Sequence, residues 1–212
     1  MLVKLTCSYI LLCTKLRLGL FTRHLRNFLI AFFLLSVGVQ TIILLATIFG
    51  SSELGLGTTN LIVTVLLIQF VAILGAWVFS NVSKKLGNFM AIKITIFIWI
   101  LVCFSAFMLE KELKNVEIYF YALGGLLGLV LGAIQSLTRS TYSKLLPKTQ
   151  DNATYFSFYD VTEKIAIVLG TFVFGFLIYL TDSMQWSVLS LALFFVAALI
   201  VLSTLKRTEH VH

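Results

Sequence analysis

Charged side chains are scarce in this sequence of 212 residues. Only 12% of the residues are Asp, Glu, Lys or Arg, whereas 59% are hydrophobic, and the mean hydropathy is +1.02. A soluble domain carries most of its charged residues on a hydrated surface, and this composition cannot supply one. The sequence therefore excludes a soluble domain and predicts an integral membrane protein.

Histidine and cysteine are also few, and neither forms a reactive pattern. The histidines are His24, His210 and His212, and the cysteines are Cys7, Cys13 and Cys103. All three histidines lie outside the long apolar runs, and the sequence has no Gly-x-Ser-x-Gly motif, so a nucleophile with a neighbouring base is not expected. The cysteines lack the paired spacing of a metal site or a disulfide framework. We therefore expect no enzymatic activity, no metal and no cofactor.

Long apolar runs dominate the rest of the chain. About 20 consecutive apolar residues cross the hydrocarbon layer of a bilayer as a helix. Six such spans are predicted, at 27–50, 58–80, 90–109, 116–138, 154–181 and 185–205. They are too long for the strands of a membrane barrel, which are about 10 residues long and alternate in polarity. The predicted fold class is an all-α membrane protein.

Lysine and arginine are distributed unevenly among the connectors. Basic residues cluster before the first span, in the second and fourth connectors, and after the last span, whereas the first and fifth connectors carry only Glu53 and Asp182. Because basic connectors stay in the cytoplasm, both termini are predicted to be cytoplasmic, in a bacterial inner membrane. The net charge of +7 is dispersed among the spans, so nucleic-acid binding is not expected.

These features divide the chain into three parts. Residues 1–26 are basic and interrupted by charge too often to form a span, which favours an amphipathic lead-in on the cytoplasmic face. Residues 27–205 form the six-helix transmembrane domain. Residues 206–212 are a cytoplasmic tail.

Several polar side chains interrupt the apolar spans. Ser36, Gln40 and Thr47 follow one another at spacings of four and seven, so they share one stripe of the first span. Gln135 lies in the fourth span. These residues are predicted to line a solute pathway, although amides at such positions also join neighbouring helices at about 0.6 kcal/mol for each hydrogen bond.

Charges gather near the cytoplasmic ends of the fourth and fifth spans. Gly128 and Gly132 share one helical face with Gln135 and Arg139, and the two glycines are predicted to pack against another helix. Across the connector lie Asp160, Glu163 and Lys164. With Arg139 they are predicted to form a cytoplasmic gate or charge network, and the alternative is that they only reach the lipid headgroups. Asp160 and Lys164 are spaced for a helical ion pair.

Longer stretches resemble a known family. The stretches that carry the resemblance are Gly38–Thr41, Ala46–Gly50, Glu53–Leu56, Gly128–Ser140, Leu145–Lys148, Tyr155–Lys164 and Val168–Gly175. Together they resemble the seventh, tenth and eleventh helices of major facilitator transporters, in the branch related to the vacuolar amino-acid effluxers of autophagy. The resemblance covers roughly residues 27–205.

The resemblance implies that the chain corresponds to the second half of a twelve-helix transporter, built from two inverted three-helix units. In such folds the first helix of each unit lines a central cavity, which places Gln40 and Gln135 on the solute path. Amino-acid efflux is the implied function. The implied surroundings are membrane lipid, a small-molecule solute, and either a separately encoded N-terminal six-helix half or a second copy of this chain. A truncated or accessory membrane module without transport is the alternative.

Three residues depart from the family's pattern. Val37 stands where many relatives have an acidic residue, so a carboxylate within the membrane is missing at that position. Lys84 replaces an acid in the second connector, which weakens the charge relay expected there. Thr171 stands where a proline often occurs, so the fifth span is expected to kink less.

Overall fold

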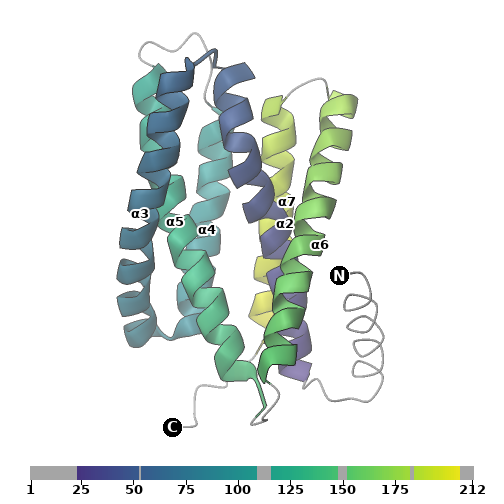
Figure 1. Ribbon diagram of the computed structural model, residues 1–212. Helices are drawn as coiled ribbons and strands as arrows, with labels where there is room; N and C mark the ends of the chain where they lie inside the picture. Colours follow the sequence, from purple (N-terminus) through teal and green to yellow (C-terminus); the bar gives the residue numbers. More distant parts are fainter. Residues whose placement is uncertain (1–22, 53, 109–115, 148–151, 182–183, 206–212) are drawn as a thin grey trace.

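The computed structural model describes residues 23–52, 54–108, 116–147, 152–181 and 184–205 (Figure 1). Its six helices are α2 Arg23–Ser52, α3 Thr58–Leu86, α4 Asn88–Phe107, α5 Val116–Leu145, α6 Asn152–Thr181 and α7 Met184–Thr204. Each helix is long and apolar enough to cross a membrane, and no strand occurs in the part of the chain described. The predicted all-α membrane fold with six spans is confirmed. Thr47 lies within α2, but its side chain is outside the described residues, as are the tail and the first 22 residues of the lead-in.

Three helices extend beyond the predicted spans toward the same end of the bundle. α2 begins at Arg23 rather than at residue 27, α3 continues to Leu86, and α5 continues to Leu145. A helix of 30 residues such as α5 is about 45 Å long, whereas the hydrocarbon layer is about 30 Å thick. The extra turns reach the headgroup region, where charged side chains stay hydrated. Arg139 consequently belongs to the helix α5 and not to a connector.

The bundle consists of two three-helix units of opposite direction. The first unit is α2, α3 and α4, and the second is α5, α6 and α7. In Figure 1, α2 begins at the lower end of the bundle and α5 begins at the upper end. The packing repeats when the units are exchanged: α3 lies against α5 as α6 lies against α2, and α4 lies against α5 as α7 lies against α2. This exchange symmetry is the signature of an inverted repeat and confirms the two units.

Glycines bring the backbones of α3 and α5 into direct contact. A Cβ atom built on Gly132 would lie 1.8 Å from the carbonyl oxygen of Ala72, and one built on Gly128 would lie 2.6 Å from that of Ile68. From the other side, a Cβ on Gly75 would lie 2.0 Å from the carbonyl oxygen of Leu129. Small residues permit such close approach between membrane helices, so this stripe determines how α5 is placed beside α3.

A second close approach places α6 against α2. A Cβ atom on Gly170 would lie 2.0 Å from the Thr41 hydroxyl oxygen and 2.8 Å from the Val37 carbonyl oxygen. Glu163 precedes Gly170 by seven residues, which is two helical turns, so both residues lie on the same face of α6. The approach at Gly170 therefore directs Glu163 toward α2.

Candidate functional site

An open hollow lies between α2, α5 and α6. Its polar lining residues are Ser36, Gln40, Gln135, Thr138, Tyr159 and Glu163, and its apolar lining residues are Phe32, Leu35, Val39 and Ile134. The consecutive helices α5 and α6 and the distant helix α2 thus bring their few polar groups together. Convergent polar groups in an otherwise apolar pocket are typical of a small-molecule site.

The centre of the hollow is a contact between an amide and a carboxylate. The Gln40 side-chain amide on α2 donates a hydrogen bond to the Glu163 carboxylate on α6, and both side chains are half-buried. A hydrogen bond to an ionised group is worth about 1.5–3 kcal/mol, more than one between neutral groups. The contact therefore links the first helix of one unit to the second helix of the other.

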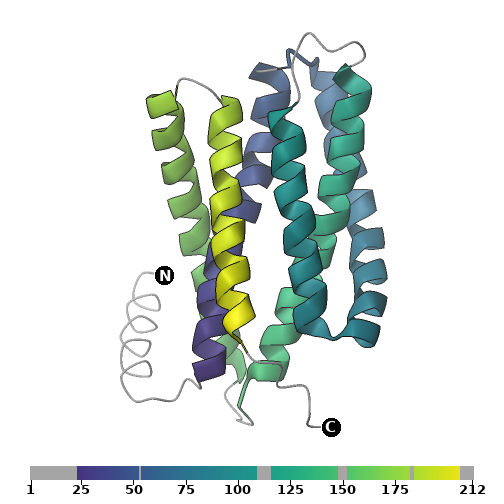
Figure 2. The same ribbon diagram turned by 180° about the vertical axis from the view of Figure 1, so that it is seen from behind.

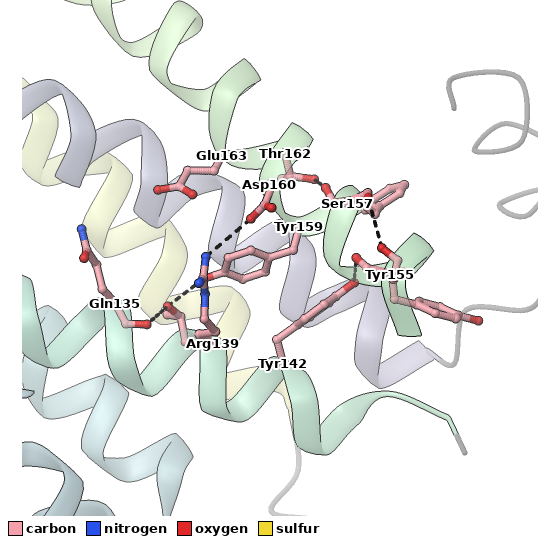
Figure 3. A network of polar contacts seen from close by, with 12 residues as sticks. Gln135, Arg139, Tyr142, Tyr155, Ser157, Tyr159, Asp160, Thr162 and Glu163 are labelled. Carbon is pink, nitrogen blue, oxygen red and sulfur yellow. Dashed lines mark hydrogen bonds and ion pairs between the residues drawn. The ribbon is translucent and has the colours of Figure 1, made fainter. Parts of the chain in front are cut away.

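The structure groups Glu163 with the predicted pathway residue Gln40 rather than with the predicted gate residues. Figure 3 shows the Glu163 carboxylate directed away from Asp160, toward the side on which the Gln135 amide lies. Glu163 on α6 thus brings a carboxylate to the hollow, which Val37 does not line. Val37 itself is buried, and its carbonyl oxygen accepts a hydrogen bond from the Thr41 hydroxyl at 2.6 Å.

Arg139 and Asp160 form an ion pair across the helix interface. The Arg139 Nη2 atom lies 3.5 Å from the Asp160 Oδ1 atom, and the two side chains are 63% and 58% exposed (Figure 3). The described residues contain no ion pair between Asp160 and Lys164, although the sequence predicted one. The Lys164 side chain is exposed. The guanidinium on α5 faces Asp160 directly, whereas pairing along α6 would restrain two flexible side chains for a weak interaction.

We expect removal of the Arg139–Asp160 pair to have a small effect on stability. Exposed ion pairs contribute about 0.2–1 kcal/mol, so Arg139→Gln should lower the free energy of unfolding in detergent by no more than about 1 kcal/mol. High salt should remove the difference between wild type and variant, because salt screens exposed charges. A larger loss that persists in high salt would show that Arg139 stabilises the bundle by packing and not by charge.

Two tyrosines, to which the sequence-based reasoning gave no role, hold the ends of α5 and α6 together. The Tyr159 and Thr138 hydroxyl groups lie 3.0 Å apart, and the Tyr159 ring stacks on Phe32 with ring centroids 4.0 Å apart. The Tyr142 hydroxyl donates to the Tyr155 carbonyl oxygen at 2.7 Å. The Arg139 guanidinium lies 5.8 Å from the centroid of the Tyr159 ring, within cation–π range. The only signal in the sequence was a tyrosine beside Asp160 in an apolar span.

A second polar cluster lies beneath the turn between α3 and α4. Gly87 is the only residue between these helices, and its φ of 85° is one that glycine adopts without strain. The Asn88 side-chain oxygen accepts hydrogen bonds from Ser83 at 2.6 Å and from Lys144 at 3.0 Å, and its amide nitrogen donates to Thr141 at 3.1 Å. Lys84 donates a hydrogen bond to the Asn81 side-chain oxygen at 3.5 Å. Asn88, a neutral amide, thus joins α4 to α5 at the place where the resemblance led us to expect a charge relay.

The other predicted site residues are placed as follows. Ser36 is buried and Gln135 is exposed, and both line the hollow. Gly128 and Gly132 face α3, although they share a helical face with Gln135 and Arg139. The two glycines contact α3, whereas Gln135 lines the hollow beside α2 and Arg139 pairs with Asp160 on α6. One face of α5 thus meets different helices at different points along its length. Among the described residues, no group of three or more His, Cys, Asp or Glu side chains is placed to hold a metal ion.

Comparison with known proteins identifies relatives of this chain. The family described as Vacuole effluxer Atg22 like matches residues 14–210. An uncharacterised MFS-type transporter of Bacillus subtilis, YxiO, is 31% identical over 181 residues, which cover 85% of this chain and 41% of that protein. Autophagy-related protein 22 of Vanderwaltozyma polyspora is 30% identical over 168 residues, covering 76% of this chain and 32% of that protein.

The relatives are considerably longer than this chain. Autophagy-related protein 22 of Saccharomyces cerevisiae is 29% identical over 189 residues, which cover 84% of this chain but only 35% of that protein. The chain thus spans about one third to two fifths of the length of the curated relatives it matches. No solved structure matches it.

Proposed function

Since this chain belongs to the Atg22-like vacuole effluxer family, we propose that it forms one half of a secondary-active transporter for a small solute. The observation that carries the proposal is the contact of the Gln40 amide with the Glu163 carboxylate inside an apolar six-helix bundle. Ionisable groups at membrane depth are costly and mark solute or ion pathways. Gln40 and Gln135, on α2 and α5, line the path in this proposal, and Arg139 with Asp160 clamps its cytoplasmic end.

The proposed process is amino-acid efflux across a bacterial cytoplasmic membrane. The relatives' names include a vacuole effluxer and an MFS-type transporter, and the resemblance to vacuolar amino-acid effluxers supplies the solute class. Arg26, Lys85 and Lys144 lie at the end of the bundle where α2 begins and α3 and α5 end. Basic residues remain on the cytoplasmic side, which supports cytoplasmic termini.

The proposal requires a partner that covers the polar hollow. α3 and α6 lie on the two flanks of the bundle, whereas α4 and α7 form the face seen in Figure 2. Large apolar side chains on these flanks are uncovered: Phe70 and Trp77 are each 69% exposed, Phe172 is 72% exposed and Tyr179 is 80% exposed. We propose that a complementary six-helix half, or a second copy of this chain, covers the side bearing the hollow, and that lipid covers the remainder.

Transport measurements on the reconstituted assembly test this function. Proteoliposomes that contain the chain with its partner should exchange at least one radiolabelled amino acid from a panel, faster than empty liposomes do. Glu117→Gln is a suitable control because Glu117 contacts Asn60 at the opposite end of the bundle, at 2.7 Å, and it should leave the flux unchanged. Flux of other solutes without any amino acid would contradict amino-acid efflux. Absence of flux for every solute would support the alternative, an accessory module without transport.

A further inference from the structure

Glu163 brings an uncompensated negative charge into the hollow. It is the one charged side chain among the residues that line the hollow. Of the nearby cations, Arg139 pairs with Asp160, and Lys164 is the adjacent residue on α6, so its side chain leaves on a different face. Within the described ranges, the partner of the Glu163 carboxylate is the neutral amide of Gln40.

A neutral amide is a weaker partner for a carboxylate than a cation is. The amide already makes a charge-assisted hydrogen bond, but a cation adds the Coulomb attraction between two unit charges, which partial burial strengthens by lowering the effective dielectric constant. An ammonium group that entered the hollow would therefore replace the Gln40 amide. The amide could stay close, because its own oxygen can accept a hydrogen bond from the ammonium group.

We propose that Glu163 determines the solute specificity of this site by binding the protonated amino group of the solute, and that Gln40 occupies this position in the empty hollow. This inference rests on the proposed function. In this role Glu163 favours solutes that carry an amine over carboxylic acids of the same shape, because a second negative charge beside Glu163 is repelled. In this inference the aliphatic remainder of the solute lies against Phe32, Leu35 and Val39, which form the apolar wall of the hollow.

Equilibrium binding of three small probes separates the contributions of amine and carboxylate. Radiolabelled valine is bound to the full-length chain, purified with its partner, and displaced by isobutylamine, which lacks the carboxylate, or by 3-methylbutanoate, which lacks the amine. We expect isobutylamine to displace valine and 3-methylbutanoate to be at least about tenfold weaker, the factor that corresponds to 1.4 kcal/mol.

Variants at position 163 test whether the Glu163 carboxylate causes the preference for the amine. Glu163→Gln keeps an oxygen that can accept the Gln40 hydrogen bond but removes the charge, so valine and isobutylamine should bind at least about tenfold more weakly. Glu163→Asp keeps the charge and should retain the preference for the amine. Glu117→Gln, the same change at the opposite end of the bundle, should bind as wild type does.

Three results would overturn the inference. They are equal displacement by the acid and the amine, an amine preference that persists in Glu163→Gln, and no binding of valine or isobutylamine by wild type. Flux of sugars or other solutes without an amine would then leave the transport function standing while this inference fails. Conversely, amine-selective binding without flux would support the role of Glu163 and contradict transport.

Discussion

Gly132→Ala is expected to prevent α3 and α5 from packing as they do, at a cost of more than about 3 kcal/mol in the free energy of unfolding. The added Cβ atom would lie 1.8 Å from the carbonyl oxygen of Ala72. The obstacle is backbone on a facing helix, so no change of rotamer can relieve it. The two helices must separate, and the contacts of the neighbouring Gly128 and Gly75 are lost with them. Unfolding in detergent and the folded yield on size exclusion measure the effect.

Gly125→Ala is the matched control on the same helix. A Cβ atom there would lie 3.5 Å from the Leu67 Cδ2 atom, an ordinary contact. Alanine is favoured over glycine in a helix by about 1 kcal/mol, so this variant should be as stable as wild type or more so. Equal stability of the two variants would show that the close approach of α3 and α5 does not hold the bundle together.

Gln40→Leu is expected to cause the largest gain of solute binding among substitutions in α2, because it removes the group that the solute replaces at Glu163. Leucine has a similar size and keeps the apolar packing, but it removes the donor to the Glu163 carboxylate. A charged group left without its partner in a half-buried site costs about 1–3 kcal/mol, which corresponds to about a 5- to 150-fold change in an equilibrium constant. Because this cost falls on the empty hollow, radiolabelled valine should bind more tightly by up to that factor, and the gain should be smaller in a Glu163→Gln background.

The control for Gln40→Leu is the same change on a different helix. Gln69 is exposed on α3 and does not line the hollow. Gln69→Leu should therefore leave binding and flux unchanged. Unaltered or weaker binding in Gln40→Leu, or the same gain in the wild-type and Glu163→Gln backgrounds, would show that Gln40 does not compete with the solute for Glu163.

The sequence predicted where the helices lie in the chain better than it predicted which helices and side chains contact one another. Spans follow from the continuous hydrophobicity of each segment, a property that no distant residue alters, and all six were found. Their ends were less accurate, because hydropathy falls at Arg139 and Lys144 although the helix continues to Leu145. Charged residues at a membrane boundary end the hydrophobic run without ending the helix, since the backbone hydrogen bonds continue into the headgroup region.

The sequence by itself determined that the chain is a six-helix membrane protein and which of its side chains are polar at membrane depth. Only the tertiary structure decided how those side chains pair: Glu163 with Gln40, and Asp160 with Arg139 instead of Lys164. The physical reason is that periodicity along one helix gives the face of each residue but not the helix that the face meets. That choice depends on close approaches such as the one at Gly170, where α2 and α6, more than a hundred residues apart in the chain, come together.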